Sequence, residues 1–570
     1  MADNPLAKRV SRRSALGLLV LAGGSVLAGC AQPATPAATQ APAAPKATEA
    51  PKPAATTAPA PAAATQAPKP AATAAPAATA APAAKTPKRG GTLKVGQPGD
   101  LSQFEPSIQN PSEFPILANV FDTPIFYDAK MVPQPFLAEK WQIAQDGLSI
   151  TVNFRKGVKF HTGREMTAED VNFSLARNQD AKTASLYKFM ADKVVKAEAP
   201  DPYTVKWSFK APYPGVYDLL SKLHIVDKEN VDKTDFTKKG SGTGPFIFTE
   251  FVPGDHITLK KNPNYWRKDA SGGALPYLDE VRIALIPDVT SMVTQLEAGA
   301  LDLILRPALT DVVRLMKDAK YGTFQGQTRT LYDILLLTSK GPFTNKKVRQ
   351  AVNWIINREQ YWKTVVLGLG DWQCTPWPAQ SQAYFPDLAK SVKPDLNKAK
   401  QLMAEAGVPN GFQTSILTSR QRQSEYSDIA VLYQQDLAKI GIQARIEEVD
   451  NAAYDQRHLN EGFETAVHAY ARANYDPDTL IGGAKAWTPT IGMTRFGPPE
   501  YIKLYEDAGS SYNMEERKPK YRKLCEYIID EAFCLPLMYN PEYFIFQKYV
   551  VGATADVDYN TDFSQTWLDK

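Results

Sequence analysis

Residues 137–177 read LAEKWQIAQDGLSITVNFRKGVKFHTGREMTAEDVNFSLAR, and this stretch places a strand pattern directly before a helix pattern. Apolar residues alternate over 148–154, which predicts a half-buried strand, and the following Lys156-Gly157 predicts a turn that closes a hairpin. Thr167 followed by Asp170 has the spacing of a capping box, so we predict that a helix begins there. The segment therefore indicates a fold that contains both sheets and helices.

Strand patterns dominate the first half of the chain, and helices alternate with strands in the second half. We predict a strand at 90–96 and two strands within 242–266, joined by Pro253-Gly254. The other predicted elements are helices within 345–360 and 398–407, a helix, glycine and strand within 432–449, a helix at 521–529 and a strand at 534–538. Helix and strand in alternation are typical of α/β units, and residues 88–570 are too many for one core, so we predict two α/β lobes.

The chain starts with the features of an export signal. Basic residues at 8–13 precede an apolar run, Leu16 to Leu27, that is shorter than the ~20 residues of a membrane span. The alternative is a buried core helix. Leu27-Ala28-Gly29-Cys30 resembles the lipobox of bacterial lipoproteins, which implies that residues 1–30 are a signal peptide with a lipobox, that cleavage occurs just before Cys30, and that this cysteine becomes the lipid-anchored mature N-terminus. Ser11-Arg12-Arg13 resembles a twin-arginine export signal, although two adjacent arginines are also common in ordinary basic leaders.

Residues 31–87 consist almost entirely of Ala, Pro, Thr, Gln and Lys. Such a composition has too little apolar surface to offset the entropy of ordering, and repeated proline favours extended conformations. We therefore predict a disordered tether that holds a folded body away from a membrane.

Composition excludes several functional classes. The net charge is +4 over 570 residues and no long basic run occurs, so nucleic acid is not expected as a partner. The five histidines are scattered without metal-ligand spacing, and we find no catalytic motif, so we expect no metal, no cofactor and no enzymatic activity. The glycine-rich stretch 240–244 lacks the rest of a phosphate loop and predicts a turn. Cys525 and Cys534 could form a disulfide or remain buried thiols, and the sequence leaves both open.

These segments, in this order, resemble a known family. GGTLKVG at 90–96, the blocks 137–177 and 242–266, and VRQAVNWIINRE, AKQLMAEAG, DLAKIGI and CLPLMY further on are similar to the family 5 extracellular solute-binding proteins of ABC importers, the peptide and nickel group. The resemblance covers nearly everything from Gly90 to the C-terminus. It implies a two-lobed periplasmic-binding-protein-like fold of type II, with an extra subdomain in the first lobe and a hinge of two segments.

The resemblance also implies where the lobes lie in the chain. Lobe I is expected at 88–333 and 536–570, with the subdomain at about 130–230, and lobe II at 334–535. We expect the hinge near Tyr332 to Leu337 and Leu535 to Tyr539. A solute would bind between the lobes and favour the closed form.

The ligand is the least determined part of this hypothesis. In peptide-binding relatives, an aspartate in the segment that matches 468–480 pairs with the peptide amine, and here that position falls at Ala473. The candidate ligand contacts are Tyr470, Arg472, Asn474 and Asp476, together with Trp377 in the loop 374–380. Arg472 would favour a carboxylate or phosphate. Alternative interpretations are a surface charge for Arg472, a turn or cap for Asp476, and packing for Tyr470 and Trp377.

The expected function is a lipid-anchored, extracytoplasmic, monomeric receptor that delivers a peptide or similar small solute to the permease and ATPase subunits of an ABC importer. The alternative within the family is a receptor for an oligosaccharide or an opine-like anionic metabolite. A secreted hydrolase or a purely adhesive surface protein would be a different class. No motif supports the hydrolase, and an adhesive protein would not need a hinge.

Overall fold

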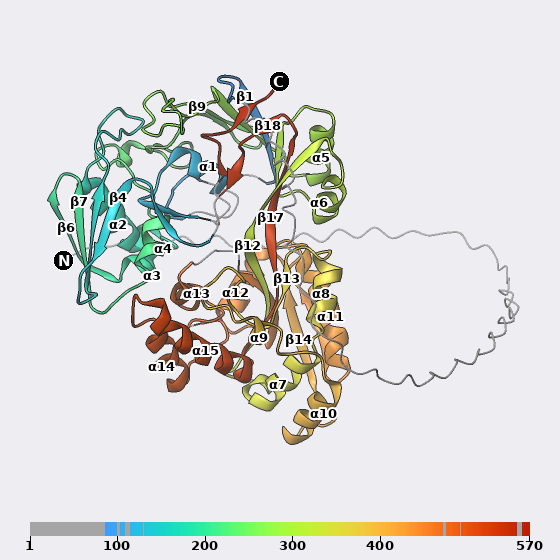
Figure 1. The fold of residues 1–570 in the computed structure, drawn as a ribbon. Helices are drawn as coiled ribbons and strands as arrows, with labels where there is room; N and C mark the ends of the chain where they lie inside the picture. Colours follow the sequence, from blue (N-terminus) through green and yellow to red (C-terminus); the bar gives the residue numbers. More distant parts are fainter. Residues whose placement is uncertain are drawn as a thin grey trace, which may run out of the picture. The chain divides into compact units, whose positions relative to one another are not determined.

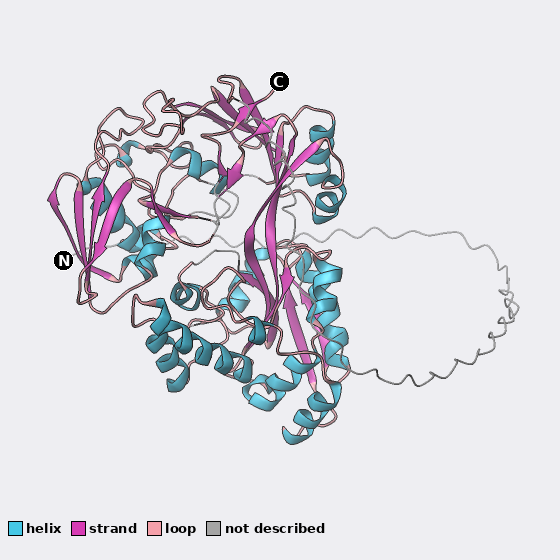
Figure 2. Ribbon diagram, viewed as in Figure 1, coloured by secondary structure: helices cyan, strands magenta, loops and turns pink. Residues whose placement is uncertain are grey.

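The computed structural model of the protein describes residues 86–99, 103–108, 114–128, 130–470, 475–490, 492–555 and 561–570. The predicted signal, Cys30 and residues 31–85 of the predicted tether lie outside these residues. Strands and helices both occur throughout the described chain (Figure 2). The helices are α1 (Phe114–Val120), α2 (Ala168–Gln179), α3 (Lys188–Ala191), α4 (Val216–Lys222), α5 (Val289–Glu297), α6 (Leu309–Leu315), α7 (Lys346–Ile355), α8 (Arg358–Val365), α9 (Pro386–Ala389), α10 (Leu396–Glu405), α11 (Glu425–Ala438), α12 (Asn451–Leu459), α13 (Pro477–Gly483), α14 (Pro499–Ala508) and α15 (Met514–Glu531).

Most strands belong to one mixed sheet. Its order is β15 (Gln443–Glu448), β14 (Gln413–Thr418), β16 (Thr465–Tyr470), β12 (Tyr321–Leu336), β17 (Cys534–Gln547), β11 (Leu303–Leu305), β1 (Thr92–Gln97), β10 (Glu280–Leu285), β9 (His256–Lys261) and β8 (Phe246–Val252), with β13 (Asp371–Trp372) paired to β17. A separate antiparallel sheet has the order β4 (Ala138–Ile143), β5 (Ser149–Phe154), β7 (Thr204–Phe209) and β6 (Val194–Asp201). Two-stranded pairs are formed by β2 (Ile125–Tyr127) with β3 (Pro133–Pro135), β18 (Val550–Val551) with β21 (Trp567–Leu568), and β19 (Thr554–Ala555) with β20 (Thr561–Asp562).

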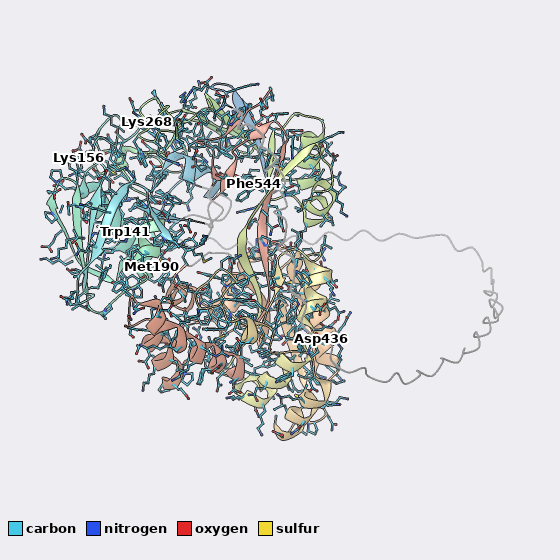
Figure 3. All side chains as sticks on the ribbon, in the orientation of Figure 1. Trp141, Lys156, Met190, Lys268, Asp436 and Phe544 are labelled. Carbon is cyan, nitrogen blue, oxygen red and sulfur yellow. The ribbon has the colours of Figure 1, made fainter. Side chains whose placement is uncertain are left out.

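Three large hydrophobic clusters lie along the described chain. The first core contains buried residues from Leu93 to Phe121, from Val226 to Leu305 and from Phe544 to Phe563. The second core contains residues from Leu331 to Tyr539, and the third core contains residues from Ile125 to Ile225, around the four-stranded sheet. In Figure 3, Phe544 marks the first core, Asp436 lies on α11 of the second, and Trp141 and Met190 lie in the third.

The long strands β12 and β17 connect the first and second cores. They run antiparallel beside each other, and one end of the pair lies near β1 and the other near β14 (Figure 1). Their register is irregular between Gln325 and Thr330 and again at Tyr332/Asp333, where bulges interrupt the ladder. Along β12, Phe324 packs against the first core, whereas Leu331 belongs to the second core. Along β17, Tyr539 belongs to the second core, whereas Tyr543 belongs to a separate, smaller cluster. We call the segments between these residues, 325–330 and 540–542, the crossover. The predicted hinge lay immediately beside it. The assignment of lobe boundaries stays a prediction.

Most predicted elements are confirmed. Strand β1, the β8–β9 hairpin, and α7, α10 and α11 followed by β15 lie where the patterns placed them. The helix after Thr167 is α2, and Asp170 accepts a hydrogen bond from the Thr167 N–H at 2.9 Å, as a capping box requires. Buried Val171 and Leu175 lie on its inner face.

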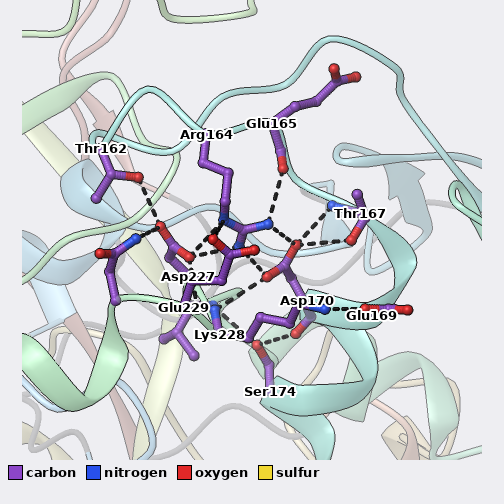
Figure 4. Close-up of polar contacts among 12 residues, drawn as sticks. Thr162, Arg164, Glu165, Thr167, Glu169, Asp170, Ser174, Asp227, Lys228 and Glu229 are labelled. Atoms are coloured by element: carbon purple, nitrogen blue, oxygen red, sulfur yellow. Dashed lines mark hydrogen bonds and ion pairs between the residues drawn. The ribbon is translucent and has the colours of Figure 1, made fainter.

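The predicted hairpin at Lys156-Gly157 is wrong. Strand β5 ends at Phe154 and pairs with β4 and β7, while the residues after Gly157 form only a single bridge, Lys159 to Glu165. Alternating burial identifies a strand, but it does not identify the strand's partner. A polar network occupies this region instead: the Arg164 guanidinium contacts the buried carboxylates of Asp170 and Asp227 (Figure 4).

The glycine-rich stretch 240–244 is a site of close packing. A Cβ atom at Gly242 would lie 2.5 Å from the carbonyl oxygen of Val120, and one at Gly244 would lie 2.6 Å from the Val120 carbonyl carbon. His161 fixes the same stretch, since its Nε2 lies 3.0 Å from the Gly244 oxygen and its Nδ1 accepts the Gly242 N–H at 3.3 Å.

The three cysteines of the described chain are buried free thiols, so the disulfide between Cys525 and Cys534 is not formed. None of the helices in the described ranges combines the length and the apolarity that crossing a bilayer needs.

Candidate functional site

The strand directions identify one edge where polar groups from two cores converge. Strand β11 runs toward the crossover, because Leu305 pairs with Phe544 while Leu303 pairs with Phe546. Strand β16 runs toward it from the other side, since its last residue, Tyr470, pairs with Leu331. Strands β1 and β10 run parallel to β11, and β14 and β15 run parallel to β16. The carboxyl ends of parallel strands, where α/β folds bind their ligands, therefore face the crossover from both cores.

Arg306 and Glu542 form an ion pair at this edge. Arg306 is the first residue after β11, its Nε lies 3.2 Å from Glu542 Oε2, and its own N–H donates to the Tyr543 carbonyl at 3.0 Å. Both side chains keep about a fifth of their surface exposed (21% and 19%). Arg306 has a φ of 49°, a left-handed conformation that costs a non-glycine residue roughly 1–3 kcal/mol. Strained residues of this kind cluster at functional sites, and the pair places one positive and one negative group at this edge.

Tyr332 lies next to the crossover on β12 and is almost completely buried. Burial raises the pKa of its hydroxyl well above the usual value, and the nearby carboxylates of Glu425 and Glu542 raise it further. Glu425 begins α11 of the second core, whereas Glu542 lies in the crossover of β17. Tyr332 is therefore a neutral hydroxyl between acidic groups from both sides of the edge.

Several buried polar atoms near these strand ends have no hydrogen-bond partner within the described chain. They are Thr418 Oγ1 at the end of β14, Gln423 Oε1 in the loop that follows, and Asn540 Oδ1 in the crossover. Buried polar groups in native proteins are nearly always paired, so unpaired ones at a common edge indicate positions that a polar solute can use.

The residues predicted as ligand contacts are placed differently from one another. Tyr470 ends β16 at the edge described above and is half-buried. Arg472 and Asn474 lie outside the described residues. Asp476 caps α13 by accepting the Asp478 N–H at 2.9 Å, and it holds Arg517 in a bidentate ion pair at 2.8 and 2.6 Å. The structure thus gives Asp476 the capping role that was its alternative interpretation.

Trp377, a candidate ligand contact whose alternative interpretation was packing, lies in the second core. Its side chain is fully buried, its Nε1–H donates to the Pro477 carbonyl at 3.1 Å, and its ring meets Tyr521 edge-on at 5.5 Å. The flanking prolines favoured an exposed, rigid loop, but the loop is drawn into the second core because Gln373 donates to the Trp377 carbonyl at 2.7 Å. Packing is the role that its contacts describe.

The sequence analysis did not identify Arg306 and Glu542. Neither residue belongs to a motif, and they are far apart in the chain, so only the pairing of β11 with β17 brings them together. The one signal available was an arginine directly after a short apolar strand, which is too common to single out.

Other parts of the described structure do not form a competing site. No group of three metal-ligating side chains is found among the described residues. A cavity of about 240 Å³ lies at the outer side of the second core, and it is lined by residues of α7, α10 and α15, among them Trp354, Lys398 and Asp530. It lies away from the strand ends, and none of the predicted contacts lines it.

Comparisons with known proteins agree with the geometry. The profile of the bacterial extracellular solute-binding proteins, family 5, middle region, matches residues 132–489. The heme-binding protein A of Haemophilus influenzae is 30% identical over 439 residues, which are 71% of this chain and 79% of that protein.

Solved structures show the same similarity. DppA of Helicobacter pylori, a periplasmic binding protein associated with an ABC transporter and solved with the peptide STSA, superposes with a TM-score of 0.73 at 29% identity, covering 85% of this chain and 99% of that one. AgaA of A. tumefaciens R10, solved with agropinic acid, also has a TM-score of 0.73, at 25% identity, covering 84% and 99%.

The fold and the facing strand ends define a periplasmic-binding-protein architecture. The chain belongs to the bacterial extracellular solute-binding proteins of family 5, and it is a substrate-binding receptor of the ABC importer type. Its relatives are solute-binding proteins rather than enzymes.

Proposed function

We propose that this protein is a lipid-anchored receptor that captures a peptide or a similar small charged solute at the crossover edge and delivers it to the permease of an ABC importer. The observation that carries the proposal is the Arg306–Glu542 pair, which places opposite charges where the strand ends of both cores meet. A solute that carries both an amine and a carboxylate can replace each partner of this pair by its own group. Arg472 and Asn474, which follow Tyr470 directly in the chain, are the further proposed contacts.

Capture requires that the two cores move as lobes about the crossover. The irregular registers at 325–330 and at Tyr332/Asp333 support a hinge there, because bulges interrupt the ladder where bending is needed. We assign residues 88–333 and 536–570 to one lobe and 334–535 to the other. Closure removes water from the solute. The solute stabilises the closed form only by the difference between its binding free energies for the closed and the open forms.

A panel of solutes tests the proposal. Thermal unfolding of the full chain with Cys30→Ser is measured with dipeptides, tripeptides, opines, oligosaccharides, hemin and nickel–histidine, because a ligand that binds the native form raises the melting temperature. We expect a shift with peptides or opines, and Arg306→Gln should abolish it without lowering the melting temperature of the free protein by more than a few degrees. A shift that is unchanged in Arg306→Gln would contradict the proposed site.

An anionic, opine-like solute is the second candidate. It is favoured by Ala473 at the position where peptide-binding relatives carry the amine-binding aspartate, and by Arg472 beside it. If it is correct, opines shift the melting temperature and peptides do not, and Arg472→Ala removes the shift.

Lipid anchoring has a separate test. Cys30 follows Leu27-Ala28-Gly29 at the proposed cleavage site. We expect wild-type protein to sediment with membranes and to incorporate a labelled fatty acid, and Cys30→Ser to do neither. Equal release of both forms into the medium would contradict the anchor.

A further inference from the structure

Asp218 connects two cores through one buried carboxylate. It lies on α4, in the third core, and is completely buried. Its Oδ2 accepts the N–H of Tyr475 at 3.1 Å, its Oδ1 accepts the N–H of Asp476 at 3.2 Å, and the Thr479 hydroxyl donates to Oδ2 as well. Within the third core, the Tyr127 hydroxyl donates to Oδ1 at 2.8 Å. Three of the four donating residues therefore belong to the segment 475–483 and not to the third core. We call this contact between Asp218 and the segment 475–483 the joint.

Packing around this carboxylate is close. The rings of Tyr127 and Tyr475 lie 4.0 Å apart, and the Lys222 ammonium lies 4.9 Å from the centre of the Tyr475 ring. A Cβ atom at Gly215, just before α4, would lie 2.7 Å from the Thr479 methyl group. The two segments thus approach each other at a distance that only glycine allows at this point.

The segment held by Asp218 is anchored firmly on its own side. Asp476 forms the bidentate ion pair with Arg517 of α15, and Leu480 and Ile481 of α13 are buried in the second core. A displacement of the segment relative to α4 therefore requires that the second core move with it.

We propose that Asp218 is a positioning residue that holds segment 475–483, and with it the second core, against the third core in the closed form of the receptor. The proposal rests on the proposed function, since it assigns to Asp218 the stabilisation of closure around a solute. The residues 471–474, which include two of the proposed contacts, directly precede the held segment in the chain. Loss of the carboxylate should consequently open the receptor and weaken solute binding.

The protonation of the carboxyl gives this role a measurable signature. Burial raises the pKa of Asp218 to about 7, the Asp476 carboxylate raises it further, and Lys222 opposes both. The Thr479 hydroxyl lies beside Asp218 Oδ2 and 2.8 Å from the Asp476 carbonyl oxygen, so it donates its hydrogen bond to Asp218 when that carboxyl is ionised, and it accepts one from Asp218 and donates to the carbonyl when the carboxyl is protonated. Burial also raises the pKa of Asp478 to about 7. The other titratable groups that interact with Asp218 or Asp476 are Tyr127, Tyr213, Tyr217, Tyr505, Tyr512, Tyr521 and Arg517.

The direction of the pH effect follows. An aspartate freed by opening has a pKa near 4, so the closed form binds the proton more tightly than the open form. The contribution to closure is complete below about pH 4 and is lost as the pH rises through about 7. Closure should therefore be weaker at pH 8 than at pH 6.

Spin-label distances test the proposal without any ligand. Nitroxides are attached to Lys206→Cys and Lys400→Cys, which are exposed positions in the third and second cores, in the full chain with Cys30→Ser. The native Cys374, Cys525 and Cys534 are buried and are not expected to react. The distance distribution is recorded at pH 6 and pH 8 for the parent protein and for Asp218→Ala.

We expect the population with the short distance to fall about tenfold in Asp218→Ala, as the loss of the hydrogen bonds of a buried carboxyl implies. The difference between pH 6 and pH 8 should shrink in the same variant. Asp227→Asn is the matched control, because Asp227 is also a buried carboxylate, a few residues after α4 in the chain, and its side-chain partners Thr162, Arg164 and Asn230 do not belong to the second core. Figure 4 shows it beside Thr162 and Arg164. The control should keep the short distance.

Two results would overturn the proposal: an unchanged distribution in Asp218→Ala, or equal opening in Asp227→Asn. If Asp218→Ala does not fold, Thr479→Val removes one donor from the far side and is expected to show the same shift in smaller size. The measurement is independent of the solute panel, so failure to find a ligand and failure of Asp218 to hold the joint are distinguished.

Discussion

Replacing Arg517 by methionine should strongly destabilise the second core. The guanidinium is buried, with 2% of its side chain exposed, and it is paired with Asp476, with 9% exposed. Burial alone would lower the pKa of Arg517, but the hydrogen bonds that it donates to Asp476 and the negative charge of that carboxylate outweigh burial and raise the pKa. Removal of one partner of such a pair leaves a buried carboxylate without compensation, which costs roughly 3–5 kcal/mol. Arg517 also donates to the Ala508 carbonyl at 3.0 Å and to the Tyr521 hydroxyl at 2.6 Å, so we expect the upper end of this range.

The double variant Arg517→Met/Asp476→Leu separates the ion pair from simple loss of packing. With both charges gone, the desolvation cost disappears, and the remaining loss should be about 1–2 kcal/mol, the contribution of the cap that Asp476 makes to α13. Urea unfolding followed by tryptophan fluorescence and circular dichroism measures the free energies of unfolding.

Arg522→Met is the control for Arg517→Met. Arg522 lies on the same helix and pairs with Asp387, but both of these side chains are exposed (40% and 60%). An exposed pair contributes at most about 1 kcal/mol. If Arg517→Met cost no more than Arg522→Met, or if the double variant were as unstable as the sum of its single variants, the reasoning about the buried pair would be refuted.

Three further predictions concern groups in the described cores. Burial lowers the pKa of His161 from 6.5 to about 4, so the unfolded chain binds the proton more tightly than the folded chain. The free energy of unfolding therefore falls by up to ~3 kcal/mol as the pH drops from 6.5 to 4. This loss should become smaller in His161→Gln when unfolding is followed as a function of pH. Gly242→Ala should destabilise the chain by ~1–3 kcal/mol in urea unfolding, since its methyl group would meet the Val120 carbonyl at 2.5 Å, and an unchanged midpoint would contradict the packing. Cys374, Cys525 and Cys534 should react with a thiol reagent only when urea unfolds the protein, because all three are buried and burial raises the pKa of the Cys525 and Cys534 thiols; rapid labelling in native buffer would show that they are accessible.

Local patterns predicted the elements of this fold well, because their causes are local. The capping box at Thr167, Asn345 before α7, whose side chain accepts the Lys347 N–H, and Gly407 after α10 are each determined by a few neighbouring residues. The hairpin at Gly157 failed because strand pairing depends on residues as distant as 204–209, about which the local alternation contains no information.

The candidate site was harder to predict for the same reason. Tyr470 was a candidate through the family resemblance of residues 468–480, and only the structure shows that it ends β16 at the edge; the sequence around Trp377 does not reveal that a core encloses its loop. Arg306 and Glu542, and Asp218 with the segment 475–483, are joined only by the folded chain: 257 positions separate Asp218 from Tyr475. No periodicity or motif links residues at such separations.

The two connections between the cores differ in kind, and this difference bears on function. The crossover joins the first and second cores covalently through β12 and β17, and its bulged registers allow bending without the loss of the whole ladder. The contact at Asp218 joins the third and second cores only by non-covalent contacts, the hydrogen bonds to its carboxyl and the packing of Tyr127 on Tyr475, which can be broken and formed again. A receptor that must release its solute needs a covalent connection, such as the crossover, that stays intact, and a non-covalent contact, such as the one at Asp218, that opens. Arg306 and Glu542 lie at the covalent joint and Asp218 at the reversible one, so variants of the former should change which solute binds, and variants of the latter should change how long it stays.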